Sequence, residues 1–384
     1  MRLLFSVTPA FGHLLPMVPL ARAAMARGHQ VGILTSAGMA DILARELPGA
    51  EHLPAGTMPA EFAAEAARRT GEDVMQPTPA AIGVIFGGVR LETASGAARR
   101  VAAGWKPEIV VAEAFDTVGP AVATELGVPW HQAGLGPALP APITASIAGA
   151  AAGWYREHDL RPMPPRTYID PCPPVMQEPG WHSPVRRVPV RSEPHATPGS
   201  AWTPPARIPG RPRVLVTLGT VFSDQAVLEE AVRAVASTGA TVIATVGMAL
   251  REAPGSARAP ASDTGSVRST GSVHFVRFAP MERLMADVDL VISAGGSGTV
   301  LAAMSRGVPM VLWPQGADQP INAARARAAG VAAVVGHGAE LPGAVISALA
   351  DENLRSAAAS AARQVAALPS ADEALTEIVN LSTV

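Results

Sequence analysis

The segment DLVISAGGSGTVLAAMSRGVPMVLWP, residues 289–314, joins two apolar stretches through a glycine-rich turn and a stretch with helical periodicity. This is the order of a strand, a helix and a second strand. The same order occurs near the start of the chain, where LLFSV (residues 3–7) and VGILT (residues 31–35) flank a helical stretch that ends at Gly28. Such units predict parallel sheets with helices on both faces, which is the α/β class.

The pattern of strands and helices is interrupted once and then starts again. Prolines crowd residues 162–212, and proline can neither pair inside a sheet nor continue a helix. A new strand, RVLVTL, begins at residue 213, and the chain of 384 residues is too long for one ordinary core. We therefore expect two Rossmann-like, doubly wound domains, the first over residues 1–200 with a proline-rich linker at its end, and the second over residues 201–384.

The charge balance and the cysteine content narrow the class of protein. The net charge is −2 and charged residues make up 16% of the chain, so we expect no broad basic surface for nucleic acid. The single cysteine, Cys172, allows no intramolecular disulfide, which favours a reducing compartment and hence the cytoplasm. The apolar stretch over residues 133–154 is interrupted by prolines, so no membrane span is expected.

The glycine-rich turn, GGSG at residues 295–298, has the design of an anion site. Residues without side chains let backbone amides close around a phosphate, and the start of a helix adds partial positive charge. A tight strand-to-helix turn would need glycines too. The dinucleotide fingerprint fits poorly, because the glycine spacing differs and the next acid, Asp318, lies beyond the strand that ends at Trp313. The only lysine, Lys106, lies elsewhere, which excludes the lysine-containing phosphate loop.

His13 and Glu113 are candidates for acid–base chemistry. His13 follows a glycine at the start of a helix, from where a side chain points into the ligand crevice of an open sheet. Histidine is the commonest general base, and a helix N-terminus favours its neutral form, but a cap or packing role is the alternative. Glu113 follows another strand and could orient the histidine, unless it is a helix cap or a solvated charge.

Asp287 and Asp289 form a carboxylate pair with a spacing that resembles that of some metal-binding pairs. They lie between a helix end and a strand start, at the edge opposite the ligand crevice. Two carboxylates without further ligands more often form solvated caps, so no metal site is expected.

Four longer segments make the chain similar to a known family, the family 1 glycosyltransferases with the GT-B fold. Within that family it resembles the actinobacterial enzymes that glycosylate polyketides and related antibiotics. The segments are GHLLPMVPLARAAMARGHQV, DPCPPVMQ, RVLVTLGTV and GGSGTVLAAMSRGVPMVLWPQGADQPINAARARAAG, of which the last is the most specific. The resemblance covers nearly the whole chain. It implies an acceptor-binding first domain and a nucleotide-sugar-binding second domain that face a central cleft, and it leaves open whether the C-terminal helix returns to the first domain.

The resemblance also implies the reaction and its residues. It implies a glycosyltransferase of the hexosyltransferase type that moves a sugar or deoxysugar from a nucleoside-diphosphate donor, expected to be a dTDP-sugar, to a natural-product aglycone. The transfer would be inverting and would use no metal and no cofactor. His13 matches the catalytic base and Glu113 its acidic partner. The donor-binding residues would be Thr220, Phe278, Ala294, Gly295, Gly296, Ser297, Gly298, Thr299, Asp318 and Gln319. The acceptor-binding residues would be Phe11, Phe86, Trp130, His131 and Trp154.

Two positions depart from the family pattern. Ala294 stands where the family has a histidine before the double glycine, and Met281 stands where it has a glutamine. A weaker hold on the donor is therefore expected. Two alternatives follow: a sugar-nucleotide-binding partner of another transferase with reduced catalysis, and a GT-B epimerase, which would need no acceptor. The sequence leaves open the sugar, the aglycone, O-, C- or N-linkage, a homodimer and an auxiliary activator protein.

Overall fold

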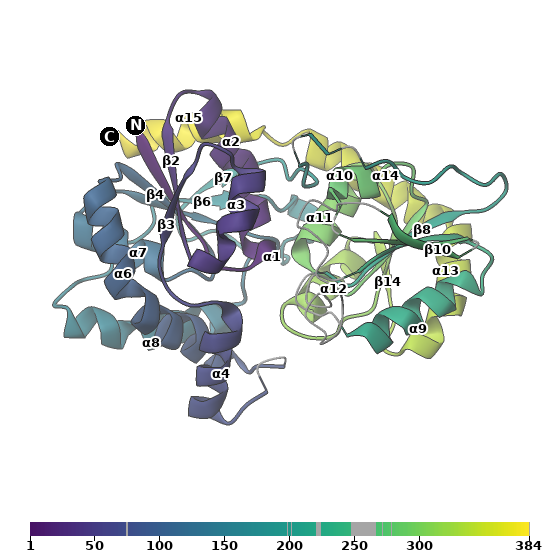
Figure 1. The fold of residues 1–384 in the computed structure, drawn as a ribbon, viewed down its shortest axis with the longest axis horizontal. Coiled ribbons are helices and arrows are strands. Elements are labelled where there is room, and N and C mark those ends of the chain that lie inside the picture. Colours follow the sequence, from purple (N-terminus) through teal and green to yellow (C-terminus); the bar gives the residue numbers. More distant parts are fainter. Residues whose placement is uncertain are drawn as a thin grey trace. The chain divides into compact units, whose positions relative to one another are not determined.

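The chain folds into two compact units, which Figure 1 shows as a ribbon. The computed structural model describes residues 1–73, 76–197, 199–200, 202–219, 224–246, 266–270, 272–277 and 279–383. Unit 1 comprises Met1–Cys172, Glu178–Arg191 and Leu368–Val384, and unit 2 comprises Pro173–Gln177 and Ser192–Ala367. The units therefore divide shortly before residue 200, where we placed the domain boundary.

Unit 1 is built on a seven-stranded sheet in the order β3-β2-β1-β4-β5-β6-β7, with every neighbouring pair parallel. The strands are β1 (Arg2–Ser6), β2 (Gln30–Thr35), β3 (Glu51–Pro54), β4 (Ile109–Glu113), β5 (Trp130–Ala133), β6 (Thr167–Asp170) and β7 (Arg186–Pro189). Along β1, Leu3 and Phe5 belong to the core on one face of the sheet, while Leu4 belongs to the core on the other. Both faces are buried, as is usual for parallel sheets.

The helices of unit 1 cover the two faces of this sheet. They are α1 (Phe11–Leu14), η1 (Leu15–Met17), α2 (Val18–Ala26), η2 (Ala37–Met39), α3 (Ala40–Glu46), α4 (Pro59–Thr70), α5 (Pro79–Gly83), η3 (Val84–Val89), α6 (Arg90–Trp105), α7 (Val118–Leu126), α8 (Ala141–Glu157) and α15 (Ala371–Ser382). Residues of α2, α3 and α15 pack in the core with Leu3 and Phe5, and residues of α6, α7 and α8 pack in the core with Leu4. The sheet is therefore the middle layer of three.

Unit 2 repeats this architecture with a sheet in the order β10-β11-β9-β8-β12-β13-β14. Its strands are β8 (Arg213–Thr217), β9 (Thr241–Thr245), β10 (Ser266–Thr270), β11 (Val273–Val276), β12 (Leu290–Ser293), β13 (Met310–Leu312) and β14 (Ala332–Val334). The edge strand β10 is antiparallel to β11, and the other pairs are parallel. Its helices are η4 (Pro174–Met176), α9 (Gln225–Ala236), α10 (Met281–Leu284), α11 (Ser297–Arg306), α12 (Gln319–Ala328), η6 (Gly338–Glu340), α13 (Leu341–Ala350) and α14 (Glu352–Ala366).

The expected fold class is confirmed. The strands expected at residues 3–7, 31–35 and 213–218 are β1, β2 and β8, each shifted by a residue at most. Helix ends follow local chemistry: α7 ends at Gly127 and α11 at Gly307, both in the left-handed region that glycine adopts without a steric penalty. Within the described part of the chain, no helix is both long and apolar enough to cross a membrane.

The last helix, α15, belongs to unit 1 although α14, which precedes it, belongs to unit 2. Leu375 and Ile378 of α15 are fully buried in the core of unit 1, where helix α2 also packs. Arg27 at the end of α2 forms a two-pronged ion pair with Asp372, at 2.5 and 2.6 Å. Exposed ion pairs contribute little to stability, so the two buried side chains provide most of the attachment.

His131 of β5 makes a further, buried connection to α15. Its Nδ1 lies 2.8 Å from Oγ1 of Thr167, and its Nε2 lies 2.8 Å from Oγ of Ser382. The Ser382 hydroxyl donates its proton to the carbonyl of Ile378, so it must accept from His131. Nε2 of the His131 ring therefore carries a proton. Burial, together with repulsion from Arg166, lowers the pKa of His131 from 6.5 to about 4.

This pKa predicts a loss of stability in mild acid. Between pH 6.5 and about pH 4 the unfolded chain binds a proton at His131 that the folded chain does not bind, so the free energy of unfolding falls as the pH falls. The full shift corresponds to about 3 kcal/mol. We expect His131→Gln to be less stable than the native chain near neutral pH but to lose less stability on acidification, as measured by urea unfolding across this range. Equal pH dependence of the two proteins would contradict the assignment.

Candidate functional site

Each sheet has one place where the strand order reverses, and in open α/β sheets ligands bind beyond the carboxyl ends of the strands at that place. In unit 1 the reversal lies between β1 and β4, which pair in parallel through Leu3 to Ser6. In unit 2 it lies between β8 and β12, which pair through Leu290 to Ser293. A ligand of either unit is therefore expected at these two positions.

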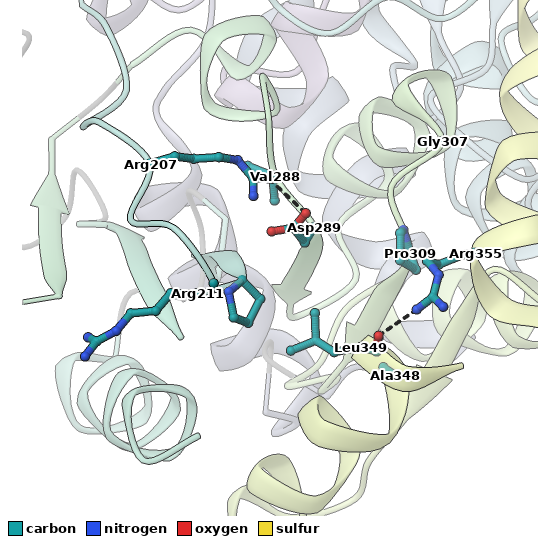
Figure 2. A pocket seen from close by; sticks show the side chains of 11 residues that line it. Arg207, Arg211, Val288, Asp289, Gly307, Pro309, Ala348, Leu349 and Arg355 are labelled. Atoms are coloured by element: carbon teal, nitrogen blue, oxygen red, sulfur yellow. Dashed lines mark hydrogen bonds and ion pairs between the residues drawn. The ribbon is translucent and has the colours of Figure 1, made fainter. Parts of the chain in front are cut away.

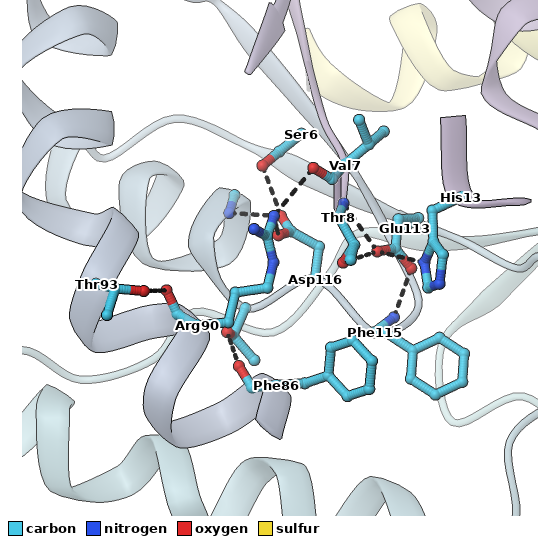
Figure 3. Close-up of polar contacts among 12 residues, drawn as sticks. Ser6, Val7, Thr8, His13, Phe86, Arg90, Thr93, Glu113, Phe115 and Asp116 are labelled. Atoms are coloured by element: carbon cyan, nitrogen blue, oxygen red, sulfur yellow. Dashed lines mark hydrogen bonds and ion pairs between the residues drawn. The ribbon is translucent and has the colours of Figure 1, made fainter. Parts of the chain in front are cut away.

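His13 and Glu113 meet at the reversal in unit 1, as Figure 3 shows. Nδ1 of His13 lies 3.0 Å from Oε1 of Glu113. His13 belongs to α1, which follows β1, and Glu113 is the last residue of β4. The side chain of Glu113 is fully buried, whereas that of His13 is 20% exposed. The structure therefore brings together the two residues that the sequence proposed as base and acid.

The carboxylate of Glu113 is held by backbone and hydroxyl donors besides His13. The Thr8 hydroxyl donates to Oε1 at 2.6 Å and the Thr8 amide at 3.2 Å, while the Phe115 amide donates to Oε2 at 2.7 Å. Burial alone would raise the pKa of Glu113. Attraction to a protonated His13 and the hydrogen bonds from His13, Thr8 and Phe115 outweigh burial and lower the pKa from 4.5 to about 2. Glu113 is a carboxylate at any physiological pH, and its buried position excludes the solvated-charge alternative.

Aromatic rings surround His13. The ring centroid of Phe115 lies 5.5 Å from that of His13, in an edge-on arrangement, and that of Phe86 lies 6.3 Å away. Phe86 and Phe115 are 5.0 Å apart, and Phe62 lies 6.4 Å from Phe86. Sequence reasoning proposed Phe86 but missed Phe62 and Phe115. The signal for Phe115 was available, because it lies two residues after Glu113, in the short loop that follows β4.

The other proposed acceptor residues are placed differently. Trp130 and His131 begin β5, and the amino ends of parallel strands lie at the sheet edge opposite to His13. Trp130 and Trp154 are buried in the core under α6 and α7, where their ring nitrogens donate to the Met163 carbonyl and the Ser95 hydroxyl. These three residues are structural, which corrects the expectation. Phe11, half-buried at the start of α1, packs against the other core of unit 1.

The glycine-rich turn lies at the reversal in unit 2, between β12 and α11. Gly295 has φ +94°, a conformation that other residues rarely adopt, and a Cβ there would lie 3.2 Å from the carbonyl oxygen of Gln319. Gly296 is the N-cap of α11 and makes no side-chain hydrogen bond to the first turn. Amides of a first turn that lack a side-chain acceptor are available to an anion. Gly298 is exposed and Ser297 half-buried, whereas Thr299 is buried.

A side-chain amide that the sequence analysis missed holds this turn. The Asn322 amide donates to the Gly295 carbonyl at 3.0 Å, to the Ser297 hydroxyl at 3.0 Å and to Asp318 Oδ2 at 2.9 Å. The Ser297 hydroxyl also donates to Asp318 Oδ2, at 3.0 Å. Asn322 lies four residues after Asp318, on the same face of α12, and this spacing was a usable signal. The structure thus links the glycine turn to Asp318.

Gln319 has a structural task in the same region. Its side-chain oxygen accepts from the amides of Gln315 and Gly316, at 2.8 and 3.1 Å, and so closes the loop after β13. Its amide nitrogen is the group that it can offer to a ligand.

Ala294 makes no exposed surface. It is fully buried and packs in the core of unit 2 with residues such as Val216 and Trp313. Its methyl group therefore cannot contact a donor, which corrects its assignment as a binding residue. Thr220 and Phe278, the remaining donor candidates, lie outside the described residues.

An open cavity of ≈ 600 Å³ lies at the opposite, amino edge of the same sheet, near the starts of β8, β12 and β13 (Figure 2). Its charged side chains are largely engaged. Arg207 pairs with Asp287 and Asp289 at 2.7 and 2.8 Å, and Arg355 donates to the Leu349 carbonyl at the end of α13. A helix C-terminus disfavours an anion. This cavity is therefore not the phosphate site that the glycine turn suggests.

Comparisons with known proteins agree on one family. The model for the C-terminal domain of erythromycin biosynthesis protein CIII-like proteins matches residues 257–381. The elloramycin glycosyltransferase ElmGT of Streptomyces olivaceus is 31% identical over 332 residues, covering 84% of this chain and 83% of that protein. The L-demethylnoviosyl transferase of Streptomyces niveus is 29% identical over 359 residues, covering 88% and 86%.

Solved structures give the same answer for the fold. The glycosyltransferase SsfS6 of Streptomyces sp. SF2575, determined with thymidine diphosphate, superposes with a TM-score of 0.81 at 26% identity and 99% coverage of both chains. The glycosyltransferase SnogD of Streptomyces nogalater gives a TM-score of 0.77, also at 26% identity and 99% coverage of both chains. With the His13–Glu113 pair and the glycine turn in place, the chain belongs to the actinobacterial natural-product glycosyltransferases of the GT-B fold.

Proposed function

We propose that this glycosyltransferase, which transfers sugar from a nucleotide sugar to an aglycone, does so with inversion at the anomeric carbon, without a metal, and from a dTDP-sugar. The observation that carries the proposal is the contact of 3.0 Å between His13 and a buried, fully charged Glu113. A base prepared in this way activates an acceptor hydroxyl, as a one-step inverting displacement requires.

The geometry of the pair defines the route of the proton. Nδ1 of His13 faces Glu113, so the proton on Nδ1 is held by the carboxylate and Nε2 accepts the proton of the acceptor hydroxyl. The acceptor oxygen forms its bond to the anomeric carbon as the bond from that carbon to the diphosphate breaks. The electron pair of the broken bond leaves with the diphosphate, and Glu113 stabilises the imidazolium that forms.

The charge that develops on the diphosphate needs stabilisation, and the turn at Gly295–Gly298 supports a metal-independent solution. Backbone amides and the N-terminus of α11 provide fixed positive potential without a side-chain charge. Asp318 is held next to this turn by Ser297 and Asn322 and would accept hydrogen bonds from sugar hydroxyls. The Gln319 amide nitrogen would donate hydrogen bonds to sugar hydroxyls there. The preference for thymidine diphosphate is supported by the ligand of SsfS6.

The His13–Glu113 pair also helps to distinguish an active transferase from the two alternatives, a sugar-nucleotide-binding partner with reduced catalysis and an epimerase. A binding partner with reduced catalysis would have no need for a buried carboxylate that orients a histidine, so the pair favours an active transferase. An epimerase would convert a dTDP-sugar in the absence of any acceptor. Incubation with the donor alone therefore separates the epimerase from the transferase.

We expect His13→Ala to lower kcat by about two to four orders of magnitude, because that is the usual contribution of a general base. Donor affinity should persist, since the glycine turn belongs to the other unit. Turnover of a dTDP-sugar and calorimetric titration of thymidine diphosphate measure the two effects. If donor affinity fell as much as kcat, His13 would be a binding residue instead.

Glu113→Gln removes the charge behind His13, and we expect kcat to fall by a factor on the order of 10³–10⁴. The acidic limb of the pH profile of kcat/KM should also move to lower pH, because the negative charge that stabilises the protonated ring is gone. Protonation of Glu113 itself cannot produce that limb in the native protein, since its pKa is about 2. Glu113→Asp, which keeps the charge on a shorter side chain, is the matched variant and should retain the position of the limb. A profile unchanged in Glu113→Gln would refute this role.

Gly295→Ala tests the turn on the donor side. The positive φ of Gly295 makes a side chain unfavourable by about 1–2 kcal/mol, and relaxation would rotate the amides that face the diphosphate. We expect the dissociation constant for thymidine diphosphate to rise on the order of tenfold. The control is Gly343→Ala in α13, where a Cβ would meet nothing within 4 Å. Unchanged affinity in Gly295→Ala would show that the turn does not hold the diphosphate.

A further inference from the structure

We infer that Arg90 is a positioning residue for the transfer reaction, an inference that rests on the proposed role of His13 and Glu113. Arg90 is the first residue of α6, and the hydrogen bonds of its side chain go to Val7 and Asp116. Its side chain is only 3% exposed, and the carboxylate that it faces, Asp116, is fully buried. Figure 3 shows both to one side of Glu113 and His13.

The guanidinium of Arg90 joins two separate loops. Its Nη2 donates to Oδ1 of Asp116 at 2.6 Å and to the carbonyl oxygen of Val7 at 3.0 Å. Val7 lies in the loop after β1, and Asp116 lies in the loop after β4. The second oxygen of Asp116 accepts from the Ser6 hydroxyl at 2.6 Å and from the Gly119 amide at 2.8 Å. Both oxygens of the Asp116 carboxylate are therefore hydrogen-bonded.

These two loops are the ones that hold Glu113. Val7 is followed by Thr8, whose amide and hydroxyl bind Oε1, and Asp116 is preceded by Phe115, whose amide binds Oε2. The Asp116 amide also donates to the Glu113 carbonyl at 2.9 Å. A displacement of either loop therefore moves a donor of the Glu113 carboxylate, and with it the orientation of the His13 ring.

Arg90 also lies close in sequence to Phe86, one of the aromatic rings beside His13. It directly follows η3, a turn of π-helix that carries Phe86. The Phe86 carbonyl accepts from the Thr117 hydroxyl at 2.6 Å, so the loop after β4 is joined to this helix at two places, through Thr117 and through Asp116. Irregular helical turns of this kind are frequent at functional sites. Arg90 thus connects the helical segment that carries Phe86 with both loops that hold Glu113.

Stability alone does not account for such a group. Removing two charges from water is costly, and apolar residues of similar volume often serve a core equally well. The contacts of Arg90 to one carboxylate and one carbonyl instead define a single relative position for the two loops. A misplacement on the scale of 1 Å can lower a rate by about a hundredfold.

The test compares Arg90→Met, Arg90→Lys and the double variant Arg90→Met/Asp116→Asn with the native chain. Arg90→Met leaves a buried carboxylate without its partner, and the double variant removes both charges so that folding does not decide the outcome. The matched control is Arg187→Met. Arg187 pairs at 2.7 Å with the buried Asp170 between β6 and β7 of the same unit, away from the carboxyl ends of β1 and β4.

The probes are dTDP-glucose with 4-methylumbelliferone as acceptor, and an NMR titration of the His13 ring, assigned with His13→Ala, which needs no turnover. We expect Arg90→Met and the double variant to lower kcat about 10- to 100-fold with unchanged affinity for thymidine diphosphate. The titration midpoint of the His13 ring should shift to lower pH, because Glu113 is no longer held against it. Arg90→Lys should show smaller changes in kcat and in the His13 titration midpoint than Arg90→Met. Arg187→Met should lower the melting temperature and leave kcat and the His13 titration midpoint unchanged.

The inference is wrong if the double variant folds with the native kcat and the native His13 titration, or if Arg187→Met reproduces both effects. This failure is distinguishable from failure of the proposed function. If the native chain with dTDP-glucose transfers nothing and His13→Ala changes nothing, the reaction assignment fails, whereas the titration of the His13 ring still reports whether Arg90 positions it.

Discussion

A carboxylate buried at the end of β4 is the constraint on which the site in unit 1 depends. Glu113 is withdrawn from water and yet has a pKa of about 2, which requires donors at nearly every lone pair. Those donors come from the loop after β1, the loop after β4 and His13 of α1. Only a sheet in which β1 and β4 are parallel neighbours brings the three together. The charge state of Glu113 therefore depends on the strand order, because the pairing of β1 with β4 brings together the donors that lower its pKa.

Unit 2 uses the equivalent position in its sheet for a different purpose. Where unit 1 buries a negative charge, unit 2 presents neutral amides at the start of α11 and shapes them with a glycine at φ +94°. The turn is held from behind by Asn322, whose amide spans Gly295, Ser297 and Asp318. One architecture therefore presents a histidine–carboxylate pair in one unit and the amides of a helix N-terminus in the other. The difference lies in a few residues after each strand, which is why related folds can support many reactions.

The site could be predicted from the sequence where a residue follows directly from a strand or begins a helix. His13, Glu113 and the glycine turn satisfy that condition, and the structure places them at the carboxyl ends of their strands. Trp130, His131 and Trp154 were chosen for their residue type, and all three proved to be structural because they lie in strand or helix segments that face the core. Residue type without position in the element was a poor guide.

The sequence by itself determined the α/β class, the two units and the candidates His13 and Glu113, because strand and helix periodicity and glycine turns are local signals that span a few residues. Tertiary structure alone decided the contacts between distant segments. Thr8 and Glu113 are 105 residues apart, Arg90 and Val7 83 residues, and His131 and Ser382 251 residues. Such contacts follow from the order and register of strands in the sheet, which no local pattern encodes. The same reason explains why Arg90 and Asn322 became visible only in the folded chain.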